Sequence, residues 1–187
     1  MCYNELGFEE EREDFMSYKS FESIAHEMLT NQKFLRLAHE SHHGITRLDH
    51  SLNVARKVYK YSIKLNLDYV SATRAAIVHD FFTNAEFLSN HGLIQGVVHP
   101  DIALANARGE FEINDKEANM IESHMFPLSV VMPKSKEAWL LTGVDKLQAI
   151  YEYASYKFNY RKATDRLSYA LGCMLLFAFF MITKGGE

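Results

Sequence analysis

Hydrophobic positions along the chain follow a helical pattern almost from one end to the other. Apolar residues recur at spacings of three and four, in segments that begin just after polar capping residues such as Ser20, Thr46 and Asn114. No segment of strand length alternates between polar and apolar positions, and no repeat of solenoid length is present. The pattern therefore predicts an all-α fold, a helical bundle of roughly seven to eight helices.

The predicted helices are separated by short polar or Pro-containing breaks. They are expected at residues 21–29, 31–43, 46–65, 69–81, 99–109, 114–124, 135–156 and 164–184. His99-Pro100 is interpreted as a cap followed by Pro at the first helical position, and Gly109 as the end of that helix. Residues 83–98, which contain several Asn and Gly, are expected to be irregular.

Composition narrows the class of protein. The chain has 187 residues, of which 48% are hydrophobic and 24% charged, as in an ordinary globular domain. We expect a single domain over residues 1–187, with residues 1–16 as an acidic flexible arm and residues 164–184 as an apolar C-terminal helix. The net charge of −4 excludes a chain-wide basic surface, so no nucleic-acid polymer is expected as a partner.

The two cysteines, Cys2 and Cys173, stand near opposite ends of the chain and provide no disulfide framework. The first seven residues lack the basic and apolar regions of a secretory signal. The sequence therefore predicts a cytoplasmic protein.

The informative polar residues are histidines and aspartates at helix ends or on apolar helix faces. His79-Asp80 ends an apolar helix, His50 lies in a first helical turn, and His124 ends another helix. Asp145 lies among leucines. A buried carboxylate is costly unless compensated, and a divalent cation would compensate it. One such histidine alone is more often a hydrogen-bonded core residue, but the set is harder to explain in that way.

These residues carry a family resemblance. Leu-Asp-His50-Ser-Leu-Asn-Val-Ala, followed by Ala-Ala-Ile-Val-His79-Asp80, resembles the HD superfamily of metal-dependent phosphohydrolases, whose minimal pattern is H…HD…D. Asp145 matches the last Asp. His99, in Gly-Val-Val-His-Pro, and His124, in His-Met-Phe-Pro-Leu, resemble the extra histidines of the six-ligand branch, as found in small bacterial HD proteins. The resemblance covers about residues 43–152.

The resemblance implies two divalent metal ions. His50, His79, Asp80 and Asp145 would hold the first ion, and Asp80 would bridge to a second ion held by His99 and His124. Imidazole and carboxylate ligands without thiolates suit Fe, Mn, Co, Ni or Zn. The implied reaction is hydrolysis of a small phosphate ester, with a nucleotide as the first candidate, by metal-activated water and with Asp80 as a catalytic residue.

Two other functions remain open at this stage. The same six ligands also resemble those of HD-fold mixed-valence di-iron oxygenases. The third alternative is a non-catalytic sensor or partner-binding domain that keeps the fold.

The chain departs from the common HD pattern directly after the ligand pair. Many relatives have His-Asp-Ile-Gly-Lys, whose lysine can bind phosphate, whereas this chain has Phe81-Phe82. The phosphate contact must then come from elsewhere, and Lys146, Arg108 and Arg47 are candidates for substrate binding. Lys146 ranks first, also as a catalytic group, because it adjoins Asp145, although a cation of this kind is more often a solvated surface charge than a substrate contact.

His43 is a further catalytic candidate. It precedes the helix that carries His50 and could act as an acid/base group at the mouth of the site. An exposed histidine in a loop that ends a helix is an equally good interpretation.

Residues 167–183 contain no charged side chain. As a helix they would span about 25 Å, slightly short of a bilayer core. A tail anchor is one interpretation, but we favour a buried helix or a subunit interface, because a helix that is apolar all round can be buried between protomers. The predicted partners are therefore a small-molecule phosphate and, through this helix, a second copy in a homodimer. No membrane association is expected.

Overall fold

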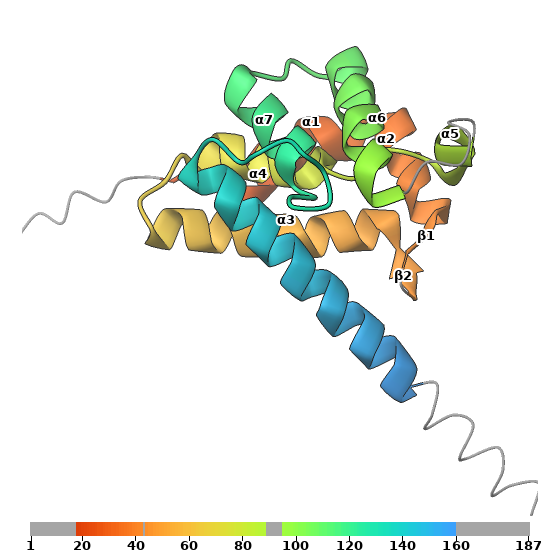
Figure 1. The fold of residues 1–187 in the computed structure, drawn as a ribbon. Coiled ribbons are helices and arrows are strands. Elements are labelled where there is room, and N and C mark those ends of the chain that lie inside the picture. Colours follow the sequence, from red (N-terminus) through yellow and green to blue (C-terminus); the bar gives the residue numbers. More distant parts are fainter. Residues whose placement is uncertain (1–17, 43, 89–94, 160–187) are drawn as a thin grey trace, which may run out of the picture.

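Helices make up nearly all of the computed structural model in the parts that it describes, which are residues 18–42, 44–88 and 95–159 (Figure 1). The elements are α1 (Phe21–Thr30), α2 (Gln32–Leu35), the 3-10 helix η1 (Arg36–His39), β1 (Ser41–His42), β2 (Ile45–Thr46), α3 (Arg47–Lys64), α4 (Tyr69–Val78), α5 (Asn84–Leu88), α6 (Gln95–Glu110) and α7 (Asp115–Ser123). A further helix covers residues 136–159. The predicted all-α fold is confirmed.

Helix α4 lies at the centre of the bundle. It packs against α1, α3 and α7, and seven of its ten residues are buried. Several of these are small, including Ala72, Ala75 and Ala76, so neighbouring helices can approach closely. This packing places the C-terminal end of α4, which leads into His79 and Asp80, inside the protein.

Capping residues begin several helices where the sequence predicts. The Oγ1 of Thr46 accepts a hydrogen bond from the backbone N–H of Asp49 at 3.0 Å, which fixes the first turn of α3. Asn114 and Glu117 form a reciprocal capping box at the start of α7. These caps set the two helices that carry His50 and lead into His124.

Several boundaries differ from the prediction. The helix expected at residues 31–43 is divided into α2, the 3-10 helix η1 and strand β1. Helix α6 begins at Gln95, four residues before His99, so Pro100 lies inside the helix and Gly109 does not end it. Pro100 costs the helix one backbone hydrogen bond near its start, and the helix continues across it. Residues 83–98 were expected to be irregular, yet they contain α5 and the first residues of α6.

A short antiparallel pair, β1 with β2, interrupts the helices. Strands of two residues are too short to produce a detectable alternation, which is why the sequence did not predict them. Gly44 lies between the strands with a positive φ of 92°, and the ring of Tyr156 occupies the space that a Cβ atom would need there. The pair therefore packs against the helix over residues 136–159.

That helix crosses α3 and continues beyond the rest of the bundle (Figure 1). Among the residues described, no helix is both long and apolar enough to cross a membrane. The acidic segment 1–16 and the apolar run 167–183 fall outside the described residues.

Candidate metal centre

Six imidazole and carboxylate side chains meet inside the bundle, and all are buried. One lies in the first turn of α3, two directly follow α4, one is in α6, one directly follows α7, and one is on the helix over residues 136–159. They are His50, His79, Asp80, His99, His124 and Asp145. The structure thus brings together all six residues that the sequence suggests as metal ligands.

Two of the histidines occupy equivalent positions just after a helix. The Nδ1 atom of His79 lies 2.8 Å from the carbonyl oxygen of Ala76, and Nδ1 of His124 lies 2.7 Å from that of Ile121. A carbonyl oxygen only accepts hydrogen bonds, so Nδ1 carries the proton in both rings. In the neutral rings this leaves a lone pair on Nε2, the atom that points into the cluster.

A carboxylate orients the third ring in the same way. Nδ1 of His50 lies 2.7 Å from Oε2 of Glu152, while Nε2 of His50 lies 3.0 Å from Oδ1 of Asp145. The sequence analysis missed Glu152. Its signal was available, because Glu152 follows Asp145 by seven residues, or two turns along one helix face, and Gln148 lies between them on that face. Gln148 also donates a hydrogen bond to Glu152.

The cluster has two halves, each centred on a carboxylate oxygen. Oδ1 of Asp145 lies 3.0 Å from Nε2 of His50 and 3.4 Å from Nε2 of His79. Oδ1 of Asp80 lies 3.2 Å from Nε2 of His99 and 3.6 Å from Nε2 of His124. The covalent His79-Asp80 pair joins the two halves.

The donor atoms of this cluster suit a cation. Nε2 of His79 and Oδ1 of Asp80 are buried and have no hydrogen-bond partner within the described parts of the chain, although buried polar atoms are normally paired. Nε2 of His99 and Nε2 of His124 face each other at 2.8 Å. Three overlapping groups of residues each offer three ligand atoms that lie within 4.8 Å of one another. The groups are His50, His79 and Asp80; His79, His124 and Asp145; and Asp80, His99 and His124. These residues could hold metal ions.

Electrostatics keep both carboxylates ionised. Burial opposes ionisation of Asp80, but the charge of His79 and the nearby imidazole of His99 outweigh burial and hold the pKa of Asp80 well below its usual value. Asp145 behaves in the same way, since the hydrogen bond with His50 and the nearby imidazole of His79 overcome its burial and lower its pKa. Both side chains are therefore charged ligands at neutral pH.

The imidazoles differ in protonation. Burial opposes protonation of His50, but hydrogen bonds to Asp145 and Glu152 outweigh it and raise the pKa of His50 to about 10. Burial, together with neighbouring histidines that include His99, lowers the pKa of His124 to about 3. At neutral pH the ring of His124 is uncharged and can bind a metal ion without losing a proton, whereas His50 holds a proton that a metal ion would displace.

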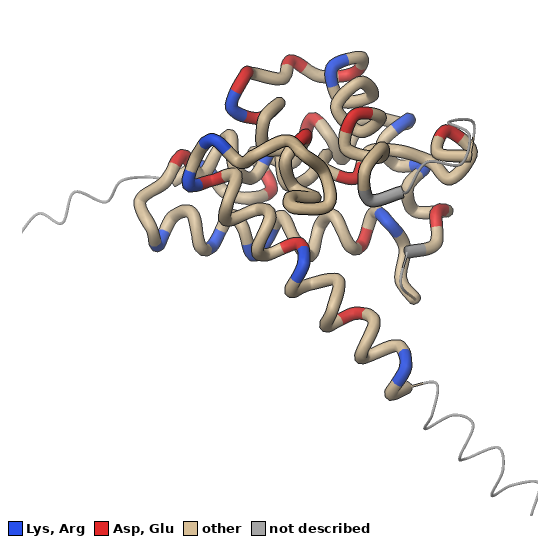
Figure 2. Tube along the Cα trace, viewed as in Figure 1, with Lys and Arg blue, Asp and Glu red and all other residues tan. Residues whose placement is uncertain are grey.

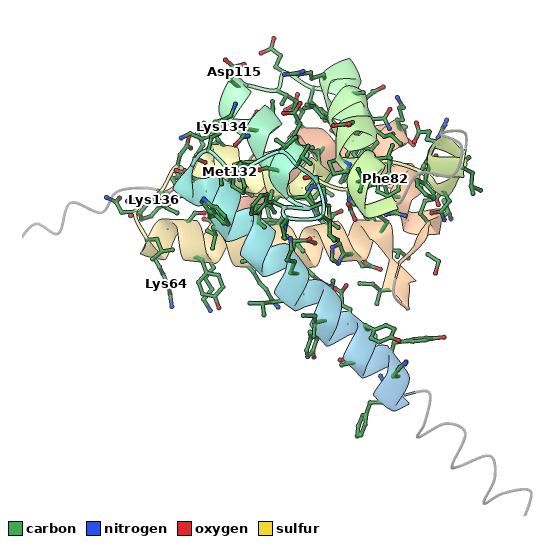
Figure 3. All side chains as sticks on the ribbon, viewed as in Figure 1. Lys64, Phe82, Asp115, Met132, Lys134 and Lys136 are labelled. Atoms are coloured by element: carbon green, nitrogen blue, oxygen red, sulfur yellow. The ribbon has the colours of Figure 1, made fainter. Side chains whose placement is uncertain are left out.

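A buried arginine lies beside the cluster. The guanidinium of Arg47 is 3.8 Å from the centre of the Phe82 ring, and the imidazole of His99 also stacks on that ring. Phe82 lies beside the N-terminal part of α6 (Figure 3). The Nη1 atom of Arg47 is 3.5 Å from Oδ2 of Asp80, and its Nη2 atom donates a hydrogen bond to Oδ1 of Asn84.

The other two cations predicted to bind substrate do not contact the carboxylates of the cluster. Lys146 is half-buried, and its Nζ donates a 2.9 Å hydrogen bond to the backbone oxygen of His124, so it holds the chain next to a cluster residue. Arg108 is exposed and lines a separate surface cavity together with Arg74 and Glu117. His43 is outside the described residues. Of the three cations, the structure brings only Arg47 against a carboxylate of the cluster.

Comparison with known proteins agrees with this geometry. The family model of the HD domain matches residues 47–150, which is more than half of the chain and includes all six clustered residues. HD domains bind metal ions, and metal-dependent phosphohydrolase-type activity is common among them. No curated protein and no solved structure matches the chain. The chain belongs to the HD-domain family.

Proposed function

We propose that this protein is a metal-dependent phosphohydrolase that acts on a small phosphate ester, with a nucleotide as the first candidate, at a binuclear metal site. The observation that carries the proposal is Arg47. Its guanidinium is buried beside Asp80, and its Nε and Nη1 atoms have no hydrogen-bond partner among the described residues. A buried cation with unused donors next to a metal cluster is suited to bind an oxyanion of the substrate.

The proposed ligands divide between two ions. His50, His79, Asp80 and Asp145 hold one ion, and Asp80, His99 and His124 hold the other, so that Asp80 is shared. The grouping of donor atoms supports this assignment, because Asp80 belongs both to the group with His50 and His79 and to the group with His99 and His124. Imidazole and carboxylate ligands without thiolates favour Fe, Mn, Co, Ni or Zn.

Metal ions in such a site supply an activated water and neutralise charge on the phosphate oxygens. The residues of the chain supply orientation. Glu152 fixes the ring of His50, the carbonyl oxygens of Ala76 and Ile121 fix those of His79 and His124, and Arg47 binds the phosphate. Lys146 acts as a positioning residue, because its ammonium group already donates to the backbone at His124.

The Phe81-Phe82 pair has a role in this proposal. The lysine that many HD proteins carry three residues after the Asp, at the position of Thr83 here, would approach the phosphate from the segment after α4. Here Phe82 provides a ring face on which the guanidinium of Arg47 rests at 3.8 Å. The positive charge therefore reaches the site from the start of α3, and the aromatic ring holds it in place.

The test is a substrate screen on the full chain. The protein is purified without chelator, loaded under reducing conditions with Mn²⁺, Co²⁺ or Fe²⁺, and assayed for phosphate or nucleoside release from nucleotides and cyclic nucleotides. We expect turnover of at least one ester, and none by Asp80→Asn. Failure of every ester would contradict the hydrolase. Oxygen consumption by the iron-loaded protein would instead favour the di-iron oxygenase, and unchanged metal content in His124→Ala and Asp80→Ala would favour a non-catalytic domain.

Removal of Glu152 should weaken metal binding without removing a ligand. We expect Glu152→Ala to lower metal affinity about 10- to 100-fold, because a partner that orients a ligating histidine typically contributes that much. Glu152→Gln should recover part of the loss, since its amide oxygen can still accept from Nδ1 of His50. Competition with a chelating indicator measures the affinities. Glu112→Gln, at an exposed position, is the control, and equal affinities in all four proteins would show that Glu152 does not orient the ligand.

Metal affinity should rise with pH. The pKa of His50 is raised to about 10 and that of His79 is also raised, so below about pH 10 a metal ion must displace a proton from His50. Between pH 6.5 and 9 the apparent affinity should increase about tenfold per pH unit for each proton displaced. Calorimetry in buffers of different ionisation enthalpy would count the protons released. A pH-independent affinity across this range would contradict the prediction.

A further inference from the structure

The helix over residues 136–159 crosses α3 (Figure 1), and polar side chains meet at the crossing. Charged positions of both signs occur along both helices (Figure 2). On α3 two polar residues follow His50 by three and seven positions, and on the other helix two follow Asp145 by three and seven positions. These spacings place each set on one helix face. We call the six residues the polar seam: His50, Asn53 and Lys57 on α3, and Asp145, Gln148 and Glu152 on the other helix.

The two carboxylate oxygens of Glu152 have different partners within the polar seam. Oε2 lies 2.7 Å from Nδ1 of His50. Oε1 accepts a hydrogen bond from Nε2 of Gln148 and a longer one, at 3.4 Å, from Nδ2 of Asn53. Both Gln148 and Glu152 are buried. The two amides therefore hold one oxygen of Glu152, which leaves the other directed at the imidazole of His50.

Lys57 determines which way the amide of Gln148 faces. An amide side chain can be turned by 180°, which exchanges the positions of its oxygen and its nitrogen. Nζ of Lys57 donates to Oε1 of Gln148, and an ammonium group has no acceptor, so the oxygen must face Lys57. The NH₂ group then faces Glu152 and donates to it. In the reversed orientation two acceptor oxygens would face each other, and the hydrogen bond to Glu152 would be lost.

Lys57 makes this contact from the protein surface. Its side chain is exposed, whereas Gln148 is 3% exposed. Nζ of Lys57 also lies 5.7 Å from the centre of the Tyr151 ring, within the range of a cation–π contact. Tyr151 follows Gln148 by three residues, so the two are neighbours on the surface of one helix. The ammonium group is thus held where it meets the buried amide.

We propose that Lys57 and Gln148 are positioning residues for the metal centre. Lys57 fixes the amide of Gln148, Gln148 fixes the carboxylate of Glu152, and Glu152 orients the imidazole of His50. The inference rests on the metal binding of the proposed function but not on the reaction. It extends the orienting set two turns along α3 from His50 to the protein surface. Because the hydrogen bonds reach His50 by way of Glu152, the effect of Lys57 on metal binding should disappear when Glu152 is removed.

The test is a double-mutant cycle of metal affinity on the full chain, measured for Mn²⁺ or Co²⁺ by competition with a chelating indicator. Lys57→Met keeps the apolar stem but removes the ammonium group, and it should lower affinity about three- to tenfold, the effect of losing one hydrogen bond. Lys57→Arg should recover most of the loss, because a guanidinium group also donates. Lys57→Met/Glu152→Ala should bind as Glu152→Ala does, since Lys57 acts through Glu152.

Lys60→Met is the matched control. Lys60 is exposed on the same helix, about one turn beyond Lys57, and its loss changes the net charge by the same amount. Its affinity should equal that of the wild type. Equal losses in Lys57→Met and Lys60→Met would indicate an effect of net charge, and equal losses with and without Glu152 would indicate another route. Either result, or wild-type affinity in Lys57→Met, would overturn the proposal.

The metal-free protein provides a second readout that is independent of turnover. His50 is buried, so its Nδ1–H should exchange slowly with water and be observable by NMR of protein labelled with ¹⁵N-histidine. We expect exchange about three- to tenfold faster in Lys57→Met than in the wild type or Lys60→Met. Faster exchange in a protein that hydrolyses no ester would support the positioning and contradict the hydrolase. Equal exchange in a protein that hydrolyses an ester would contradict the positioning alone.

Discussion

Asp80→Asn is expected to remove nearly all bound metal from the protein. Oδ1 of Asp80 faces the Nε2 atoms of both His99 and His124, and Oδ2 faces Arg47. Asparagine keeps the shape but removes the charge that two cations would share. Breaking a buried charge pair costs about 3–5 kcal/mol, which corresponds to a roughly hundred- to several-thousand-fold loss of affinity. Mass spectrometry of the protein purified without chelator gives moles of metal per chain.

Asp101→Asn is the matched control for this experiment. Asp101 lies on α6, two residues after His99, but its side chain is exposed, so its removal should leave metal content unchanged. Equal metal content in wild type and Asp80→Asn would show that Asp80 is not a shared ligand. If Asp80→Asn kept one of two ions, Asp80 would be an essential ligand of the lost ion only.

The sequence could predict most of the cluster residues because they occupy positions that local rules can recognise, whereas His99 was found only through the resemblance to the HD pattern. His50 follows a capping residue by one turn, and His79 and His124 come directly after an apolar helix. A buried position for an imidazole beside a carboxylate follows from the apolar residues around it. The way in which these positions converge is tertiary, and only the resemblance to the HD pattern linked them.

Lys146 adjoins Asp145 in the sequence but contacts a different residue of the site. It ranked first as a phosphate contact because it adjoins Asp145, but successive residues on a helix point about 100° apart. The side chain of Lys146 therefore diverges from that of Asp145 and reaches the backbone at His124. Arg47, three residues before His50, lies on nearly the same helix face as that ligand and is buried with it.

The contact between Arg47 and Phe82 could not be predicted locally, because it joins the start of α3 to the segment after α4. The packing of α3 on α4 brings them together. The early start of α6 was missed for a similar reason. Statistics favour Pro100 at the first helical position, whereas here the helix continues through Pro100 and buries His99, Ala103 and Ala107.

Arg47→Lys is expected to impair phosphate binding while the metal centre stays loaded. Lysine keeps a positive charge, but it cannot make two parallel hydrogen bonds to an oxyanion or lie flat on the ring of Phe82. Loss of one well-placed donor to developing charge typically lowers kcat about 10²- to 10³-fold. We expect a fall of that size in kcat/KM for the ester identified in the screen, with metal content near that of the wild type.

Inorganic phosphate provides a readout that does not depend on turnover. Calorimetric titration of the metal-loaded protein should show phosphate binding weakened by Arg47→Lys and, to a smaller degree, by Phe82→Leu, which removes the ring beneath the guanidinium. Arg108→Lys, on an exposed part of α6, should bind phosphate as the wild type does. The proposal would be contradicted if Arg47→Lys kept both phosphate affinity and kcat/KM within about twofold of the wild type, a change that corresponds to less free energy than one ordinary hydrogen bond. The buried guanidinium would then only neutralise Asp80, and another cation would have to bind the substrate.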